Sequence, residues 1–176
     1  MNNTFEIKKD VYYVGVNDKD LEIFDIIMPT KYGTTYNSYL IKDEKIVLFD
    51  TVKENFKDEF FNNLKEVTDI SAIDYVVVHH TEPDHSGALK YLLEINPEIE
   101  VICTKAAKTY LDGQINKEFK FHIIKDGEVI NIGKRNLKFL ATPYLNWVDK
   151  MFTYVEEDGV LFTCDAFGTH YASTDA

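Results

Sequence analysis

The sequence predicts an α/β (α+β) fold with mixed sheets, and three observations support this prediction. Short runs of aromatic and β-branched residues, typical of strands, fill the first third of the chain. Strands then alternate with helical patterns, which is typical of parallel strand pairs. Hairpin signals return near the end, so we expect parallel and antiparallel pairing together. With 176 residues, 45% of them apolar, the chain should form one domain spanning residues 1–176.

Strands dominate the predicted elements of the first third. We expect them at residues 11–16, 21–27, 36–41 and 46–49. Asp43 and Glu44 should form a tight turn between the last two strands. A helix is expected from about Glu54 to Val67, because apolar side chains recur there at helical spacing. This apolar stripe predicts a helix packed on the core.

The rest of the chain alternates between the two kinds of element. We expect strands at residues 75–78, 101–103, 119–124, 137–141, 151–155 and 160–163. Helices are expected at residues 86–95 and 105–111, the second ending near Gly113. Asp158 and Gly159 form a strong hairpin signal. His122 lies inside one predicted strand, and we assign it no role.

Four candidate metal ligands fall within the six residues His80-Thr81-Glu82-Pro83-Asp84-His85. The segment follows the buried strand at 75–78 and precedes a helix. This places it at the carboxyl end of a sheet, where open α/β folds bind their ligands. Pro83 has a fixed φ and should help to hold the turn. The sequence therefore predicts a metal site here.

The ligand types narrow the choice of metal. Imidazole suits zinc, copper or iron, whereas carboxylate oxygens suit harder ions. A zinc site for hydrolysis is usually built mostly from histidine. Two histidines with two carboxylates favour non-haem iron, and enough oxygen ligands to bridge would favour two ions. Zinc remains an alternative, because it outcompetes ferrous iron at most such sites.

A second region near the end of the chain carries further candidate ligands. The segment 142–147 follows one predicted strand, and Cys164-Asp165 follows another. Asp165 alone would be better explained as a cap. Its position after a strand, like that of the first segment, favours contact with the same metals. Cys103 and Cys164 match neither a zinc pair nor a disulfide framework, which favours two buried thiols in a reducing cytoplasm.

Composition limits the partners. The net charge of −11 argues against nucleic acid and anionic membranes as partners. No apolar run reaches the roughly 18 residues of a membrane span, and the first residues lack the apolar core of a signal peptide. A cytoplasmic protein with a basic or neutral redox partner fits this composition.

Six motifs occur in order along the chain. They are Gly33-Thr34-Thr35-Tyr36-Asn37-Ser38-Tyr39-Leu40, Phe49-Asp50-Thr51-Val52, His80 to Gly87, Thr142-Pro143-x-Leu145-x-Trp147, Met151-Phe152-Thr153-Tyr154, and Leu161-Phe162-x-x-Asp165-Ala166-Phe167-Gly168. Together they resemble the metallo-β-lactamase-like domain of flavodiiron proteins, the A-type flavoproteins, over essentially the whole chain. Glu82, where the wider superfamily has histidine, is typical of the flavodiiron branch.

The resemblance implies an αβ/βα sandwich that carries a non-haem diiron site. Members of that family also carry a flavodoxin-like domain with FMN, and they reduce dioxygen to water or nitric oxide to nitrous oxide. By resemblance, His80 and Glu82 would bind one iron and Asp84 and His85 the other. Asp165 would bridge the two. His79 is expected to support the structure or the ligands, and His170 to lie near Asp165.

Two departures from the family pattern stand out. Asn146 occupies a position where the family has a histidine ligand, and an amide oxygen would hold the first iron more loosely. The family's last histidine ligand and its flavodoxin domain lie beyond Ala176. We therefore expect a fold that is incomplete at its C-terminus, ending at residues 174–176 without a closing element.

Three functions remain open at this level. The first is the diiron domain of an oxygen or nitric oxide reductase, unable to turn over alone because the FMN would belong to a separate domain. Its partners would be a rubredoxin or a flavodoxin-like domain, with O2 or NO as substrate and a homodimer as assembly. The second is a stand-alone module that binds or senses oxygen. The third is a zinc-dependent hydrolase of the superfamily, which Glu82 argues against.

Overall fold

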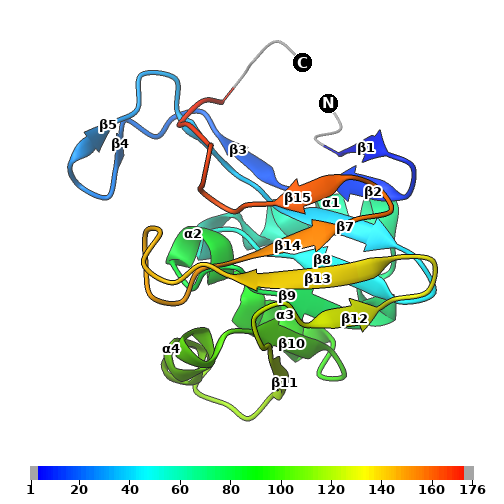
Figure 1. Ribbon diagram of the computed structural model, residues 1–176. Helices are drawn as coiled ribbons and strands as arrows, with labels where there is room; N and C mark the ends of the chain where they lie inside the picture. The colour runs from blue at the N-terminus through cyan, green and yellow to red at the C-terminus, as the bar shows by residue number, and fades with distance from the viewer. Residues whose placement is uncertain (1–3, 173–176) are drawn as a thin grey trace.

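Two β-sheets pack face to face, and helices cover the outer side of the larger sheet (Figure 1). The computed structural model describes residues 4–172. Within this range the larger sheet has seven strands in the order β1-β2-β7-β8-β9-β10-β11. The smaller has four in the order β12-β13-β14-β15, and two short ladders pair β3 with β6 and β4 with β5. The predicted end of the chain at residues 174–176 lies outside the described residues.

The bounds of the elements follow the chain in order. The strands of the larger sheet are β1 Phe5–Lys8, β2 Val11–Tyr13, β7 Tyr39–Lys42, β8 Ile46–Phe49, β9 Tyr75–Val77, β10 Glu100–Cys103 and β11 Lys120–Ile123. The smaller sheet contains β12 Val129–Asn131, β13 Asn136–Ala141, β14 Met151–Val155 and β15 Val160–Phe162. The ladders are β3 Val16–Asp18 with β6 Thr34–Tyr36, and β4 Ile23–Phe24 with β5 Met28–Pro29. The helices are η1 Glu54–Phe56, α1 Lys57–Val67, η2 Ile70–Ala72, α2 Pro83–Ser86, α3 Leu89–Ile95 and α4 Lys105–Ile115.

The larger sheet is mixed, as the sequence predicts. Strands β8, β9, β10 and β11 run parallel, and the connections between them contain helices. Strands β1, β2, β7 and β8 are joined by antiparallel pairs. The smaller sheet is antiparallel throughout its described strands, so only one of the two main sheets is mixed.

The central strands of the larger sheet are buried on both faces. In β8, Leu48 belongs to the core under the helices, whereas Val47 and Phe49 belong to the core between the sheets. In β9, Val76 and Val77 divide in the same way. Successive side chains of a strand point to opposite faces, so a continuous apolar run fills both cores at once.

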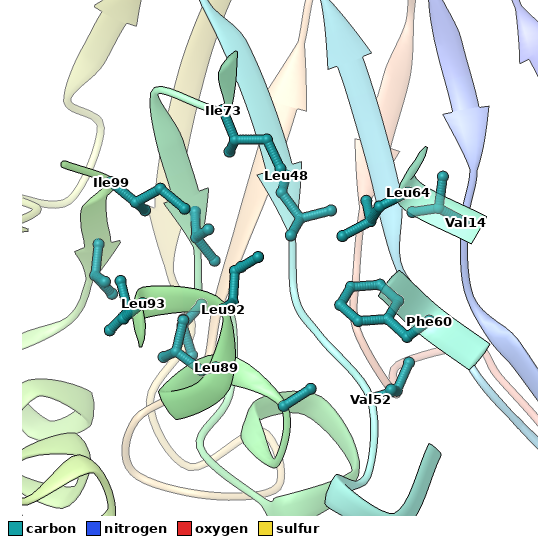
Figure 2. Packing of buried hydrophobic residues seen from close by; sticks show 14 of the residues in the cluster. Val14, Leu48, Val52, Phe60, Leu64, Ile73, Leu89, Leu92, Leu93 and Ile99 are labelled. Carbon is teal, nitrogen blue, oxygen red and sulfur yellow. The ribbon is translucent and has the colours of Figure 1, made fainter. Parts of the chain in front are cut away.

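The helices cover the first of these cores (Figure 2). Phe60 and Leu64 of α1 lie one turn apart and pack toward Val14 and Leu48 of the sheet. In α3, Leu89 and the following apolar residues of the helix close the other half of the same core. The predicted apolar stripe on the first helix is therefore confirmed as core.

Three of the predicted strands in the first third, at 11–16, 21–27 and 36–41, were wrong in their extent. The strand expected at 11–16 is divided into β2 and β3, with a break at Val14 and Gly15. An added Cβ at Gly15 would lie 2.3 Å from the Tyr36 carbonyl oxygen, so glycine allows the close approach of the Tyr36 backbone at this break. The strand expected at 21–27 is instead the hairpin of β4 and β5, because Asp25 and Ile26 have positive φ.

Other boundaries differ as well. The strand expected at 36–41 is split between β6 and β7, and β1 and β12 were not predicted. The helix expected at 86–95 is preceded by α2, which begins inside the motif at Pro83, and α3 begins only at Leu89. Helix α4 runs past Gly113 and ends where Asn116 adopts a left-handed conformation. Among the described residues, no helix is long and apolar enough to cross a membrane.

Candidate metal centre

The candidate centre lies where the two main sheets meet at one end. Strands β8 and β9 are parallel neighbours, so Asp50 and His79, which follow them, emerge at the same edge. The smaller sheet contributes Asp149 and Lys150 just before β14, and Asp165 just after β15. A hydrogen bond from the Met151 amide to the His79 carbonyl, 3.1 Å long, joins the two sides.

The motif itself is held by a short helix. Glu82 is the N-cap residue of α2 and Pro83 occupies the first turn, where its missing N–H costs nothing. Helix α2 places Asp84 and His85 on consecutive positions, and both are buried. Gly87 allows the motif to approach η1, because an added Cβ would lie 2.6 Å from the Glu54 backbone nitrogen.

The first group of candidate ligands is His80, Glu82 and Asp165. One ligand atom of each lies within 4.8 Å of the others. His80 Nε2 lies 3.0 Å from Glu82 Oε2, and the His80 side chain is fully buried. The sequence predicted these three residues, and the structure brings them together across 85 positions of chain, from 80 to 165.

The second group is Asp84, His85 and Asp165, again within 4.8 Å of one another. His85 Nε2 lies 2.5 Å from Asp165 Oδ1 and 3.4 Å from Asp84 Oδ2. Asp84 Oδ1 is buried and has no hydrogen-bond partner among the described residues. A buried carboxylate oxygen without a partner needs an explanation, and metal coordination would supply one.

Asn146 and Trp147 line the cavity above these ligands. The cavity has a volume of about 420 Å³ and is also lined by Glu82, His85 and Asp165. Trp147 lies beside His80, with ring centroids 5.6 Å apart, so it forms one wall of the site. Asn146 is itself exposed, at the rim of the same cavity.

Asp149 orients His80 and was missed by the sequence reasoning. Its carboxylate is fully buried and accepts hydrogen bonds from the Thr81 amide at 2.8 Å and from the Thr81 hydroxyl at 2.6 Å. It also lies 3.0 Å from His80 Nδ1. This contact leaves His80 Nε2 free to face Glu82. Metal-binding histidines usually have their other ring nitrogen held in this way. A lone Asp after Trp147-Val148 carried no signal in the sequence.

His79 supports the structure, as predicted. Its backbone amide and Nδ1 both contact the Asp50 carboxylate, at 2.7 and 2.9 Å, and Nε2 lies 2.8 Å from the Thr153 hydroxyl. Asp50 itself has a φ of 55°, a left-handed conformation that is uncommon outside glycine. The pair therefore locks the strand end from which the motif begins.

Lys150 is a buried cation inside the centre, and the sequence reasoning did not single it out. Its side chain is 2% exposed and its Nζ forms an ion pair with Asp165 Oδ2. Burial alone would lower the pKa of Lys150, but Cys164, Asp165 and Asp50 outweigh it and raise the pKa. The amine is therefore protonated at neutral pH.

Cys164 lies beside the candidate ligands and is only half-buried, which corrects the expectation of a buried thiol. Its Sγ lies 3.4 Å from His85 Nδ1, and it forms a third group of potential ligands with Asp50 and His85. Burial raises the pKa of the Cys164 thiol to about 11. Cys103 is fully buried in the core under the helices, as predicted.

Two histidines lie apart from the candidate ligands. His170 lines the same cavity as Asp165, but its Nδ1 lies 3.0 Å from the Thr34 hydroxyl and its ring packs on Phe24, so these contacts do not support a candidate ligand. His122 Nε2 lies 2.7 Å from Glu128 Oε1, in agreement with having no role in the site.

Burial and close charged neighbours shift the pKa values of the candidate ligands in the metal-free centre. Burial alone would lower the pKa of His85, but Cys164, Asp165 and Asp84 raise it well above its ordinary value. Burial also raises the pKa of Asp84, whereas contact with His80 lowers that of Glu82. For Asp165, contacts with His85 and Lys150 outweigh burial and lower the pKa. In the metal-free centre, the positive charges of His85 and Lys150 therefore lie in contact with the negative charge of Asp165.

The chemistry of the donor set fits a pair of metal ions. The two groups share Asp165 and offer nitrogen and oxygen ligands in the mixture that non-haem iron accepts. The unpartnered Asp84 oxygen supports the fit. The described residues do not fit FMN in the same way, because Asp25, Glu82, Asp84 and Asp165 line the cavity and would repel its phosphate.

Comparison with known proteins identifies the family. A family model described as an ODP family beta lactamase matches residues 34–176. The chain belongs to this family. It is also 49% identical over 168 residues to a flavo-diiron protein of Clostridium acetobutylicum, a match that covers 94% of the chain. A nitric oxide reductase of Moorella thermoacetica is 42% identical over 176 residues, covering 99% of the chain.

Solved structures agree with this ODP family fold. The rubredoxin oxygen:oxidoreductase of Desulfovibrio gigas matches with a TM-score of 0.94 at 33% identity, covering 98% of this chain and 43% of that one. A flavodiiron protein of Giardia intestinalis matches with a TM-score of 0.93 at 36% identity, covering 98% and 42%. The flavodiiron resemblance and the metallo-β-lactamase-like sandwich are therefore confirmed. The chain spans 42% and 44% of the length of the two curated relatives.

Proposed function

We propose that this chain is the metal-binding domain of an oxygen or nitric oxide reductase and that it holds two non-haem iron ions. One ion would be bound by His80 and Glu82, and the other by Asp84 and His85. Asp165 would be shared between them. The names of the relatives support the class of reaction, since they include a nitric oxide reductase and an oxygen oxidoreductase.

The observation that carries this proposal is the pair of ligand groups joined at Asp165. Each group gathers three candidate ligands whose donor atoms lie within 4.8 Å. Both open into one cavity of about 420 Å³, which is large enough for a diatomic gas and several waters. A shared carboxylate between two histidine-containing groups is the arrangement that two neighbouring metal ions require.

The residues of the chain then have distinct tasks. Asp149 holds the His80 ring so that Nε2 faces Glu82. Trp147 covers His80 and excludes water from that side. Bound iron would pass electrons to the gas. Asn146, which lines the cavity, would bind the first ion more weakly than histidine and leave a ligand position open. An open ligand position is where a small gas molecule can bind.

Electrons must reach this centre from elsewhere. We propose that they come through FMN on a flavodoxin-like domain or from a rubredoxin-type partner, in keeping with the names of the relatives. A homodimer and a cytoplasmic location remain predictions, as does the single-domain boundary at 1–176. The acidic charge of the chain favours a partner surface that is neutral or basic.

A second candidate function is supported by one residue. Asn146 replaces a stronger imidazole ligand, which favours binding of oxygen over its reduction, as in a sensing module. Gas uptake with and without an artificial electron donor separates the two. Consumption that depends on the donor supports a reductase, and reversible binding without consumption supports a sensor.

Metal analysis tests the centre itself. Protein produced anaerobically with ferrous iron should contain iron, and Asp165→Ala should lose most of it because both groups lose a ligand. His122→Ala is the matched control and should retain the metal, since His122 pairs with Glu128 outside the centre. Tight zinc at full occupancy under these conditions would favour the hydrolase alternative. Equal metal content in the two variants would exclude Asp165 from the site.

A further inference from the structure

The buried cation Lys150 lies where the two ligand groups meet. Asp165 is the residue that both groups share, and its two oxygens have different partners. Oδ1 lies 2.5 Å from His85 Nε2, whereas Oδ2 is paired with Lys150 Nζ. A carboxylate that bridges two metal ions uses one oxygen for each ion. Lys150 therefore holds the oxygen that the second ion would need.

The position of Lys150 is fixed by the backbone on both sides. Its carbonyl accepts a hydrogen bond from the Thr142 amide at 3.0 Å, and the next amide, of Met151, bonds to His79 at 3.1 Å. The preceding residue, Asp149, is fully buried and bound to His80 and Thr81. With a side chain only 2% exposed, the ammonium group is shielded from solvent. It is part of the centre and does not belong to the surface.

We propose that Lys150 competes with one metal ion for Asp165 and thereby makes the two metal subsites unequal. The subsite of Asp84, His85 and Asp165 Oδ1 binds its ion tightly. The subsite of His80 and Glu82 binds more weakly, because it must displace the ammonium group from Oδ2 or do without this ligand. Asn146 weakens the same subsite further. This inference rests on the proposed metal centre.

Electrostatics act in the same direction. A fixed positive charge in contact with Asp165 neutralises part of the charge that would attract a second dication, and it repels that ion at short range. In return, Lys150 keeps Asp165 in place when the second subsite is empty. Mutation of a residue that contacts a metal ligand typically changes metal affinity by about 10–100-fold. Removal of the cation should strengthen the weaker subsite by a factor in this range.

Anaerobic titration with Fe(II), followed by calorimetry, tests the inference on the 176-residue chain. The parent protein should bind one equivalent tightly and a second more weakly. Lys150→Met keeps the aliphatic stem but removes the charge, and it should tighten the second equivalent at least about tenfold. Lys150→Arg keeps a cation and should preserve the parent pattern. Lys45→Met is the control, because Lys45 pairs with Asp74 and is half exposed.

Thermal unfolding provides a second measurement that does not depend on resolving two binding steps. Lys150→Met and Lys150→Gln should be less stable than the parent without metal, and saturating Fe(II) should raise their Tm by more than it raises that of the parent. If Lys150→Met and Lys150→Gln bind the second equivalent of Fe(II) with the parent's affinity, Lys150 is only a structural partner of Asp165 and the proposal is overturned. Two equally tight equivalents in the parent would also overturn it, but they would still support the proposed metal centre. No metal in any variant would overturn the centre itself.

Discussion

Asp149→Ala should be among the most destabilising single substitutions at the site in the metal-free protein. The Asp149 carboxylate is fully buried and satisfies three donors: the Thr81 amide at 2.8 Å, the Thr81 hydroxyl at 2.6 Å and His80 Nδ1 at 3.0 Å. Each buried donor left without a partner costs about 1–3 kcal/mol. Removing one partner of a buried ion pair costs about 3–5 kcal/mol. We expect a loss of stability in this range, because water that enters the space left by the Asp149 side chain can pair with some of the three donors.

Asp149→Asn removes the negative charge of the side chain but keeps its shape, so it distinguishes the two contributions to stability. The amide fills the same volume, and its oxygen in place of Oδ2 can accept from both Thr81 donors. Only His80 Nδ1 then loses its acceptor, so the expected loss is about 1–3 kcal/mol. Urea unfolding of the metal-free protein measures both variants. With an m-value of about 2 kcal/mol/M, a loss of about 4 kcal/mol moves the midpoint by about 2 M. Asp112→Ala is the control, because Asp112 is an exposed residue paired with Lys108 on α4 and should change stability by less than about 0.5 kcal/mol.

The pH dependence of this loss follows from the two partners. Burial alone would raise the pKa of Asp149, but hydrogen bonds from His80 and Thr81 lower it to about 2, from 3.8. Its contribution is therefore present above pH 3.8 and is lost as the pH falls through about 2. Burial alone would lower the pKa of His80, but Asp149 and Glu82 raise it above 6.5, so its contribution is complete below pH 6.5 and is lost as the pH rises through the raised pKa.

The difference between the parent and Asp149→Asn should therefore be greatest between pH 3.8 and pH 6.5. A loss below about 1 kcal/mol for Asp149→Ala in this window would refute the reasoning, because it would mean that His80 and Thr81 find other partners at no cost.

Two further predictions concern the metal itself. Asn146→His should tighten iron binding by about 10–100-fold, because imidazole is a better donor than an amide oxygen; indistinguishable titrations of the two proteins would mean that position 146 does not reach the ion. Metal binding should also weaken as the pH falls from about 8 to about 6, because His80 and His85 have raised pKa values without metal and must lose a proton to bind it. Calorimetry in two buffers of different ionisation enthalpy should detect the released protons, and an affinity independent of pH would contradict this prediction.

The local pattern of the sequence was sufficient for the central part of the fold. The apolar runs of β8, β9 and β10 predicted buried strands, and the spacing of Phe60 and Leu64 predicted a core helix. These elements are buried because of their own composition, so the sequence carries the signal. The motif at 80–85 also predicted a metal site by itself, since its ligand types are dense and follow a buried strand.

The boundaries in the first third required the tertiary structure. The segment 21–27 has the composition of a strand, but positive φ at Asp25 and Ile26 turns it into a hairpin at the rim of the cavity. β-propensity describes how a residue fits a half-buried surface, and a single sequence does not say which surface is available. The division of the segments at 11–16 and 36–41 has the same origin, because the backbone bends to pair with two different sheets.

The residues that support and modify the centre were decided by tertiary structure alone. Asp149 reaches His80 across 69 positions of sequence, and Lys150 reaches Asp165 across the loop and strands that separate them. An aspartate and a lysine side by side in a polar loop look like surface residues, since charged side chains are mostly exposed. Only the packing of the smaller sheet against the end of β9 buries both residues. Once buried, Asp149 orients the His80 ring, and Lys150 pairs with the Asp165 carboxylate that a metal ion would bind.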